Sequence, residues 1–300
     1  MDGIVKLKEN DYKATKQAVL ELCERYPFLE KQIIGKSCMG RDIYALKLGR
    51  SAEYVLFAAA FHGSEHITST LLLKFLENLC EALESCSSIA GLNAPRAMYG
   101  RGLIIVPLVN PDGCEVSIHK AAGAGFMAQK INKLAKNDYT HWNANIRGVD
   151  INHNFDAGWK TLRELEQKQG ILGPAPTRFG GFAPHSEPET KALVDLCNKY
   201  RIRHVAAFHS QGEVIYWNYG AKAPKKSEKM AQIMATSSGY ALDIPTGLAV
   251  GGGFKDWFIE TFDRPGFTIE VGKGENPLNT EILPSLYKRL EEMMMLCAIM

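Results

Sequence analysis

The sequence lacks the features of a membrane or exported protein. It contains no uninterrupted run of about 18 apolar residues, the minimum for a membrane-spanning helix. Its start, Met1 to Lys6, lacks the basic flank, the apolar stretch and the small-residue cleavage site of a secretory signal. We therefore expect no membrane partner and no standard export, and we predict a cytoplasmic protein.

The sequence also lacks an excess of charge of one sign. It carries 35 Lys and Arg against 33 Asp and Glu, for a formal net charge of +2. Such a balance gives no general attraction to nucleic acid or to acidic membranes. We therefore expect no nucleic-acid partner, whereas the oligomeric state stays open.

Cysteine is scarce, and no two cysteines have the C-x-x-C spacing of a metal or redox motif. Seven cysteines in 300 residues are too few for a disulfide scaffold, and their number is odd. Free cysteines of this kind are mostly small buried apolar residues. Any metal site is therefore expected to use other ligands.

Apolar runs that alternate with helical patterns predict an α/β fold. Residues 54–61 and 103–108 are continuous apolar runs that flank a helical pattern over 69–83. This order is typical of a largely parallel sheet. A helix over 12–26 and a hairpin over 33–46 precede it, and later segments predict helices at 187–200, 227–240 and 280–300, with strands at 204–208 and 267–271.

We interpret residues 1–300 as one domain, in which residues 1–50 form a helix and hairpin that lead into the sheet. Residues 113–148 and 170–188 have weak periodicity or many prolines. Long loops of this kind on a rigid scaffold often build a functional site. We expect both to be surface excursions without a core of their own.

Three polar motifs follow or end predicted strands. His62 and Glu65 form an H-x-x-E motif after the first apolar run, His209 ends a second strand, and Glu270 lies within the third. Taken singly, each histidine could have only a structural role. Burying an unpaired carboxylate costs free energy. We therefore expect Glu270 to have an ionic or hydrogen-bonding partner, to lie near a metal, or to lie at the open end of the strand.

Sites in such folds form at the carboxyl ends of the strands, where these motifs converge. Two histidines and a glutamate are a common ligand set of catalytic zinc, which leaves one position open for water. With a further carboxylate nearby to move the proton, the set predicts hydrolysis of a carbonyl compound.

At this point the sequence resembles the zinc metallocarboxypeptidase family. The resemblance runs from the hairpin near Gly35 to the end of the chain, through the motifs above and residues 110–113 (NPDG), 148–155 (GVDINHNF), 186–190 (SEPET) and 256–257 (DW). It implies a three-layer α/β/α carboxypeptidase-like fold with a mixed, largely parallel sheet. It further implies one Zn²⁺ held by His62, Glu65 and His209, with Glu270 as general base and acid and Asp150 as partner of a ligand histidine.

Two departures from the family pattern concern substrate binding. Family members hold the terminal carboxylate of a peptide with an Asn-Arg pair and a tyrosine. Here Asn152 is kept, but His153 replaces the arginine and Leu248 the tyrosine. A neutral imidazole lacks the two-pronged guanidinium fork, so the usual carboxylate clamp is weakened or absent.

A third departure concerns the family's arginine that stabilises the oxyanion. It follows a tryptophan, and the corresponding residue after Trp142 is Asn143. Arg147, four residues later, is a candidate for that catalytic role, with a plain surface charge as the alternative.

The glycine loop at 251–253 and residues 265–278 resemble one branch, the bacterial γ-D-glutamyl-L-diamino acid (meso-diaminopimelate) endopeptidases. A leaving residue with extra amino and carboxylate groups needs a different clamp, for which His153, Arg178 and Lys255 are candidates beside Asn152. The resemblance predicts a zinc peptidase acting on small murein-derived peptides in cell-wall recycling.

Two other functions stay open at this stage. One is an ordinary metallocarboxypeptidase or a related amidohydrolase. The other is a peptide-binding protein that has lost catalysis.

Overall fold

The computed structural model describes residues 3–300, so Met1 and Asp2, the first residues of the stretch in which we expect no export signal, lie outside the described residues. Its main sheet has eight strands in the order β1-β2-β6-β3-β7-β10-β8-β9. They are β1 (Leu29–Lys36), β2 (Asp42–Leu48), β3 (Tyr54–Ala59), β6 (Gly102–Val106), β7 (Ile202–His209), β8 (Val214–Tyr216), β9 (Ala241–Asp243) and β10 (Gly266–Glu270).

The centre of the sheet is parallel and its flanks are mixed. Neighbours among β6, β3, β7 and β10 run parallel, whereas β1, β2 and β6 pair antiparallel and β8 runs antiparallel to β10. The hairpin expected over 33–46 is the β1–β2 pair. The mixed, largely parallel sheet is therefore confirmed.

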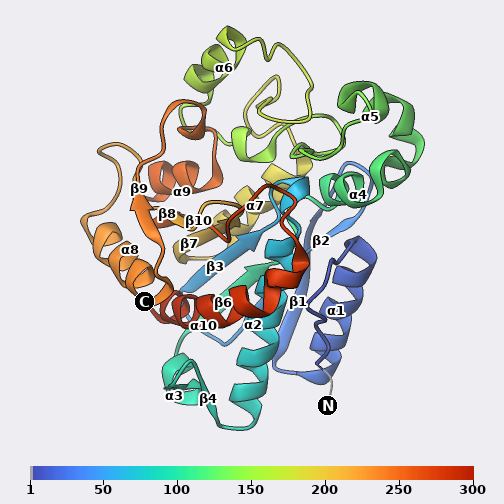
Figure 1. Cartoon of the computed structure of the whole chain (residues 1–300). Coiled ribbons are helices and arrows are strands. Elements are labelled where there is room, and N and C mark those ends of the chain that lie inside the picture. The colour runs from blue at the N-terminus through green and yellow to red at the C-terminus, as the bar shows by residue number, and fades with distance from the viewer. Residues whose placement is uncertain (1–2) are drawn as a thin grey trace.

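Helices cover both faces of this sheet, as Figure 1 shows. Alternate residues of a strand face opposite sides, so Val55 and Phe57 of β3 pack into one core and Leu56 and Ala58 into the other. The first core includes residues of α1 (Tyr12–Arg25), α2 (Ile67–Glu84), α8 (Lys225–Ser238) and α10 (Leu283–Ile299), and the second those of α7 (Pro188–Lys199) and α9 (Phe254–Phe262). The three-layer α/β/α prediction is confirmed.

The excursion over 113–148 is more ordered than its sequence suggests. It contains α4 (Pro111–His119), the 3₁₀ segment η2 (Lys120–Met127) and α5 (Ala128–Ala135). Their apolar side chains form a small cluster with the fully buried Trp142. The expectation of excursions without a core was wrong here, because glycines and lysines mask the periodicity of these short helices.

The remaining elements are short or lie at the rim of the sheet. They are η1 (Gly63–Glu65), β4 (Ser88–Ile89), β5 (Leu92–Asn93), α3 (Ala94–Met98), η3 (Ile151–His153), α6 (Trp159–Lys168), η4 (Gly247–Ala249) and η5 (Thr280–Ile282). Across residues 3–300, no helix combines the length and apolar character needed to cross a bilayer.

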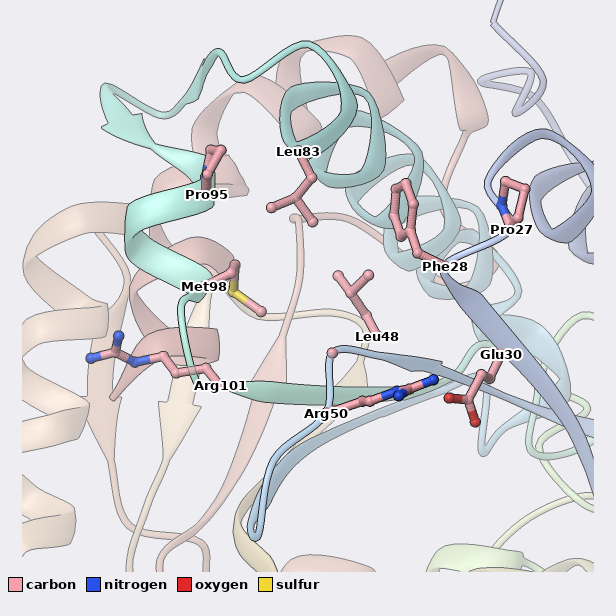
Figure 2. Close-up of a pocket in the computed structure, with 10 residues that line it drawn as sticks. Pro27, Phe28, Glu30, Leu48, Arg50, Leu83, Pro95, Met98 and Arg101 are labelled. Carbon is pink, nitrogen blue, oxygen red and sulfur yellow. The ribbon is translucent and has the colours of Figure 1, made fainter.

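A groove of about 630 Å³ lies where β2 ends and β6 begins. In Figure 2, apolar side chains from the hairpin, α2 and α3 line it, with charged groups at its edge. These include Phe28, Leu48, Leu83 and Met98, together with Glu30, Arg50 and Arg101. The groove is at the amino ends of the parallel strands, the end of the sheet opposite the polar motifs found in the sequence.

The segment that follows β3 is fixed by the polypeptide around residues 109–143. Asn110 Nδ2 donates to the carbonyl oxygens of Phe61 (3.0 Å) and Asn143 (3.2 Å). The backbone N–H of Gly63 also donates to Asn143 O, at 3.1 Å. A Cβ at Gly63 would lie 2.3 Å from Gly113 O and 2.7 Å from Trp142 O. The close approach therefore requires glycine at this position.

The substitution Gly63→Ala is expected to lower the free energy of unfolding by about 1–3 kcal/mol, because backbone atoms must move to admit the methyl group. Gly173→Ala is the control, since no atom lies within 4 Å of its added Cβ. Urea denaturation followed by circular dichroism measures both variants. Equal midpoints for the two variants would contradict the packing argument.

Candidate active site

The register of the parallel strands brings four polar residues to one edge of the sheet. β7 ends at His209 and β10 at Glu270, and these two residues pair directly. On the other side of β7, Ala59 pairs with Phe208, so the segment that carries His62 and Glu65 leaves β3 beside His209. Carboxyl ends of parallel strands thus assemble the site, as expected for this fold class.

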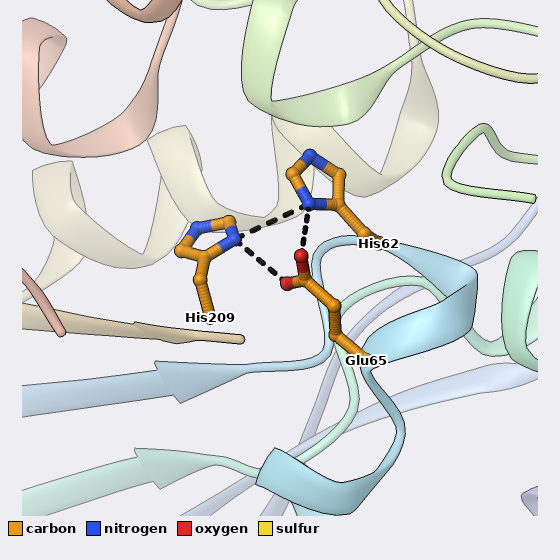
Figure 3. A group of neighbouring side chains, drawn as sticks. All are labelled: His62, Glu65 and His209. Carbon is orange, nitrogen blue, oxygen red and sulfur yellow. Dashed lines mark hydrogen bonds and ion pairs between the residues drawn. The ribbon is translucent and has the colours of Figure 1, made fainter. Parts of the chain in front are cut away.

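His62, Glu65 and His209 turn their side chains toward one point (Figure 3). Glu65 Oε1 lies 2.9 Å from His62 Nδ1, and Glu65 Oε2 lies 2.9 Å from His209 Nδ1. The two Nδ1 atoms are 3.4 Å apart. Two imidazole nitrogens and a carboxylate at this spacing fit a single zinc ion with a position left open.

Asp150 holds the far side of the His62 ring. Its Oδ1 lies 3.1 Å from His62 Nε2 and also accepts from the N–H of Asn152, and its Oδ2 accepts from the N–H of Arg178 at 2.9 Å. A carboxylate on the second nitrogen fixes the tautomer and the orientation of a ligand imidazole. The structure therefore places the Asp150 carboxylate against His62.

His209 is held differently. Its ring stacks on Phe61, with centroids 5.0 Å apart. Its Nε2 is buried and has no hydrogen-bond partner among residues 3–300. Among residues 3–300, no carboxylate holds this second nitrogen, so stacking on Phe61 helps to orient the ring.

The electrostatics of the group favour a positive charge on His62 and negative charges on Glu65 and Asp150. Burial alone would lower the pKa of His62, but the carboxylates of Glu65 and Asp150 raise it well above its usual value. Burial would raise the pKa of Glu65, but the two imidazoles lower it to about 2. Burial would also raise the pKa of Asp150, but His62 and the hydrogen bonds that Asp150 accepts hold it below its usual range. Both carboxylates are thus ionised at neutral pH.

Glu270 faces a cavity of about 150 Å³ beside this group. The cavity is lined by His62, His209, Asn152, His153, Lys255 and Glu270, and by parts of the segment 245–253. Burial and the nearby Glu65 carboxylate raise the pKa of Glu270 well above its usual value, against an opposing effect of His62. A carboxylate in this environment is a better base than an exposed one.

Three predicted substrate contacts line the same cavity. Asn152 Oδ1 accepts the N–H of Phe254 at 3.0 Å, which fixes its amide. Lys255 Nζ donates to Asn218 O at 2.7 Å and is paired with Asp256. His153 Nδ1 lies 2.7 Å from Glu166 Oε1. All three side chains are therefore held at the cavity by neighbouring groups.

The two candidate arginines do not line this cavity. The Arg147 side chain is 53% exposed, and its NH1 lies 3.7 Å from Glu187 Oε2. It lines a separate cavity of about 440 Å³ with Phe179 and Phe182. The Arg178 side chain is exposed, and only its backbone N–H contributes to the site, by donating a hydrogen bond to Asp150. The structure thus does not bring the Arg147 guanidinium to Glu270.

A second cluster of possible metal ligands contains Cys38, Glu187 and Glu189. Asn145 Nδ2 already donates to both carboxylates, at 2.7 and 3.2 Å. Burial and nearby carboxylates raise the pKa of the Cys38 thiol, and burial raises that of Glu189 to about 7. Because a protonated thiol is a poor ligand, we interpret this cluster as structural packing beneath the loop of Asn145.

Sequence reasoning missed Glu166 and Asp256 as neighbours of the cavity. Glu166 is on α6, a helix that the sequence analysis did not predict, and it lies thirteen residues after His153 in sequence. The spacing of Arg163 and Glu166 on one helix face was the available signal, but it does not identify what the pair contacts.

Known proteins share both the sequence pattern and the fold. The pattern of the zinc carboxypeptidase family matches residues 16–292. The γ-D-glutamyl-L-diamino acid endopeptidase 1 of Lysinibacillus sphaericus is 34% identical over 280 residues, which are 93% of this chain and 69% of that protein.

Two solved structures show the same fold. Carboxypeptidase A from Helicoverpa armigera has a TM-score of 0.73 at 19% identity, covering 97% of this chain and 73% of that one. Murein-tripeptide amidase MpaA from Escherichia coli O157 has a TM-score of 0.53 at 22% identity, covering 87% and 91%. Family pattern, fold and the His-Glu-His group agree, and the chain belongs to the zinc carboxypeptidase family of metallopeptidases, hydrolases that use one zinc ion.

Proposed function

We propose that this protein hydrolyses the amide bond between γ-linked D-glutamate and a diamino acid in small murein-derived peptides. The observation that carries the proposal is the cavity in which Glu270 and the His-Glu-His group lie beside His153 and Lys255. The similarity to an endopeptidase of this specificity over 93% of the chain supports the choice of bond.

His62, Glu65 and His209 are the residues that would hold the zinc ion. Zinc bound in such a site lowers the pKa of a water molecule to about 7 and polarises a carbonyl group. Asp150 keeps His62 oriented with Nδ1 toward Glu65 and His209, where the ion would be held. Phe61 does the same for His209 by stacking.

Glu270 moves the proton. It removes a proton from the attacking water as the water oxygen bonds to the scissile carbonyl carbon, and it then gives that proton to the leaving nitrogen as the C–N bond breaks. The products are a carboxylate on the D-glutamate and a free amine on the diamino acid. Because burial makes Glu270 more basic, one side chain serves both steps.

The leaving residue occupies the cavity next to Glu270. Asn152 and Lys255 supply an amide and an ammonium group there, and the ammonium is suited to the second carboxylate of diaminopimelate. Leu248 also lines the cavity, where a tyrosine would donate a further hydrogen bond. Arg178 remains a proposed contact on the exposed side, whereas Arg147 points to Glu187 and is not proposed as catalytic.

Zinc affinity is expected to fall by about tenfold for each pH unit below neutrality, because zinc displaces the proton held on His62 by its raised pKa. Competition with a chelator of known affinity measures this dependence. His209→Ala should lose tight binding, and the exposed His141→Ala should keep it. Affinity independent of pH, or equal in the two variants, would contradict the assigned ligands.

Glu270→Gln is expected to keep one zinc per chain and to lose about 10²–10⁴-fold in kcat, because the amide cannot move the proton. Glu275→Gln, an exposed position five residues later, is the matched control and should retain activity. Steady-state kinetics and elemental analysis test both variants. Substantial turnover by Glu270→Gln would overturn the mechanism.

A substrate panel tests the proposed bond. The tripeptide L-alanyl-γ-D-glutamyl-meso-diaminopimelate is expected to be cleaved with kcat/KM about 100-fold above that of α-linked peptides with an apolar C-terminal residue, since the latter offer no second carboxylate to Lys255. Mass spectrometry identifies the products. The reverse preference would indicate an ordinary carboxypeptidase, and tight binding without product a non-catalytic peptide-binding protein.

A further inference from the structure

Glu166 is a buried carboxylate that reaches the active-site cavity only through His153. Its exposed fraction is 0%, and its Oε1 lies 2.7 Å from His153 Nδ1. Its Oε2 is paired with Arg163 and accepts the N–H of Gly180 at 3.1 Å. The carboxylate therefore has a partner on each oxygen, and one of these partners lines the cavity.

The contact decides where the imidazole carries its proton. An ionised carboxylate only accepts hydrogen bonds, so Nδ1 of His153 is the protonated nitrogen. The other nitrogen, Nε2, has no hydrogen-bond partner among residues 3–300, and His153 lines the cavity. In the neutral ring this nitrogen is a hydrogen-bond acceptor.

The two carboxylates near His153 each have further partners. Glu166 is already neutralised by Arg163, whose guanidinium also lies over the ring of Phe179. Asp150, the other nearby carboxylate, is engaged by His62 and two backbone N–H groups. The His153 side chain is itself only 12% exposed.

We propose that Glu166 is a positioning residue that holds His153 as an acceptor for the protonated side-chain amine of the leaving diamino acid. This rests on the proposed function and divides the recognition of that residue between two side chains. Lys255 faces the carboxylate of the diamino acid, and Nε2 of His153 faces its ammonium group. An arginine, which has no acceptor, could not make the second contact.

A pair of tripeptides tests the assignment in the zinc-loaded enzyme. One ends in meso-diaminopimelate, and the other ends in aminopimelate, which keeps the second carboxylate and lacks the second amine. The wild type is expected to prefer the first by about 10- to 100-fold in kcat/KM, as for a hydrogen bond to a charged group. Glu166→Gln should lower this preference toward one by slowing the diaminopimelate substrate alone.

Glu164→Gln is the matched control, because this glutamate is exposed on the same helix. It is expected to leave both rates unchanged. Equal losses with both tripeptides in Glu166→Gln would reduce Glu166 to a structural residue and overturn the proposal. Slowing of the aminopimelate substrate alone would show that His153 binds the carboxylate, and would overturn it as well.

Nitrogen NMR spectra of the wild-type histidine rings test the proposal without turnover and without a variant. At neutral pH, Nε2 of His153 should be unprotonated, and its signal should shift on addition of free diaminopimelate but not of aminopimelate. A protonated Nε2 in the free enzyme would overturn the proposal. Cleavage of neither tripeptide would refute the proposed function, whereas the NMR result would still decide the role of His153.

Discussion

The parallel pairing of β3, β7 and β10 is the constraint on which the site depends. It sets His209 and Glu270 side by side and directs the segment of His62 and Glu65 to the same edge. A shift of register by one residue would turn His209 or Glu270 to the opposite face of the sheet. Cores on both faces hold the register, since the central strands are buried on each side.

Buried carboxylates form a second layer that supports the cavity. Asp150 holds His62, Glu166 holds His153, and Asp256 holds Lys255. In each case the supporting acid pairs with a side chain that lines the cavity, so the orientation of that side chain is fixed before a substrate arrives. Such preorganisation reduces the cost of ordering the site during binding and reaction.

Much of this arrangement was predictable from sequence, because each strand and the polar residues at its end are close together in the chain. Continuous apolar runs identify β3, β6, β7 and β10, and the polar residues at their ends mark the site because the carboxyl ends of parallel strands share one edge. His62, Glu65, His209 and Glu270 follow directly from that pattern. Of the supporting acids, Asp150 is implied by the family resemblance, whereas Glu166 is not, because it reaches His153 through the fold of α6 and not through sequence spacing. The placement of Arg147 also needed the structure, since its guanidinium lies beside Glu187, forty residues later, and not in the cavity of Glu270.

In the proposed function, one metal ion at His62, Glu65 and His209 acts beside a cavity that holds the diamino acid. Anomalous diffraction at the zinc absorption edge, from crystals of Glu270→Gln grown with the uncleaved diaminopimelate tripeptide, tests it most directly. We expect one peak between the two Nδ1 atoms and the Glu65 carboxylate, with the diaminopimelate end beside His153 and Lys255. A peak at Cys38, Glu187 and Glu189 instead, or a tripeptide bound with its diamino acid outside the cavity, would contradict it.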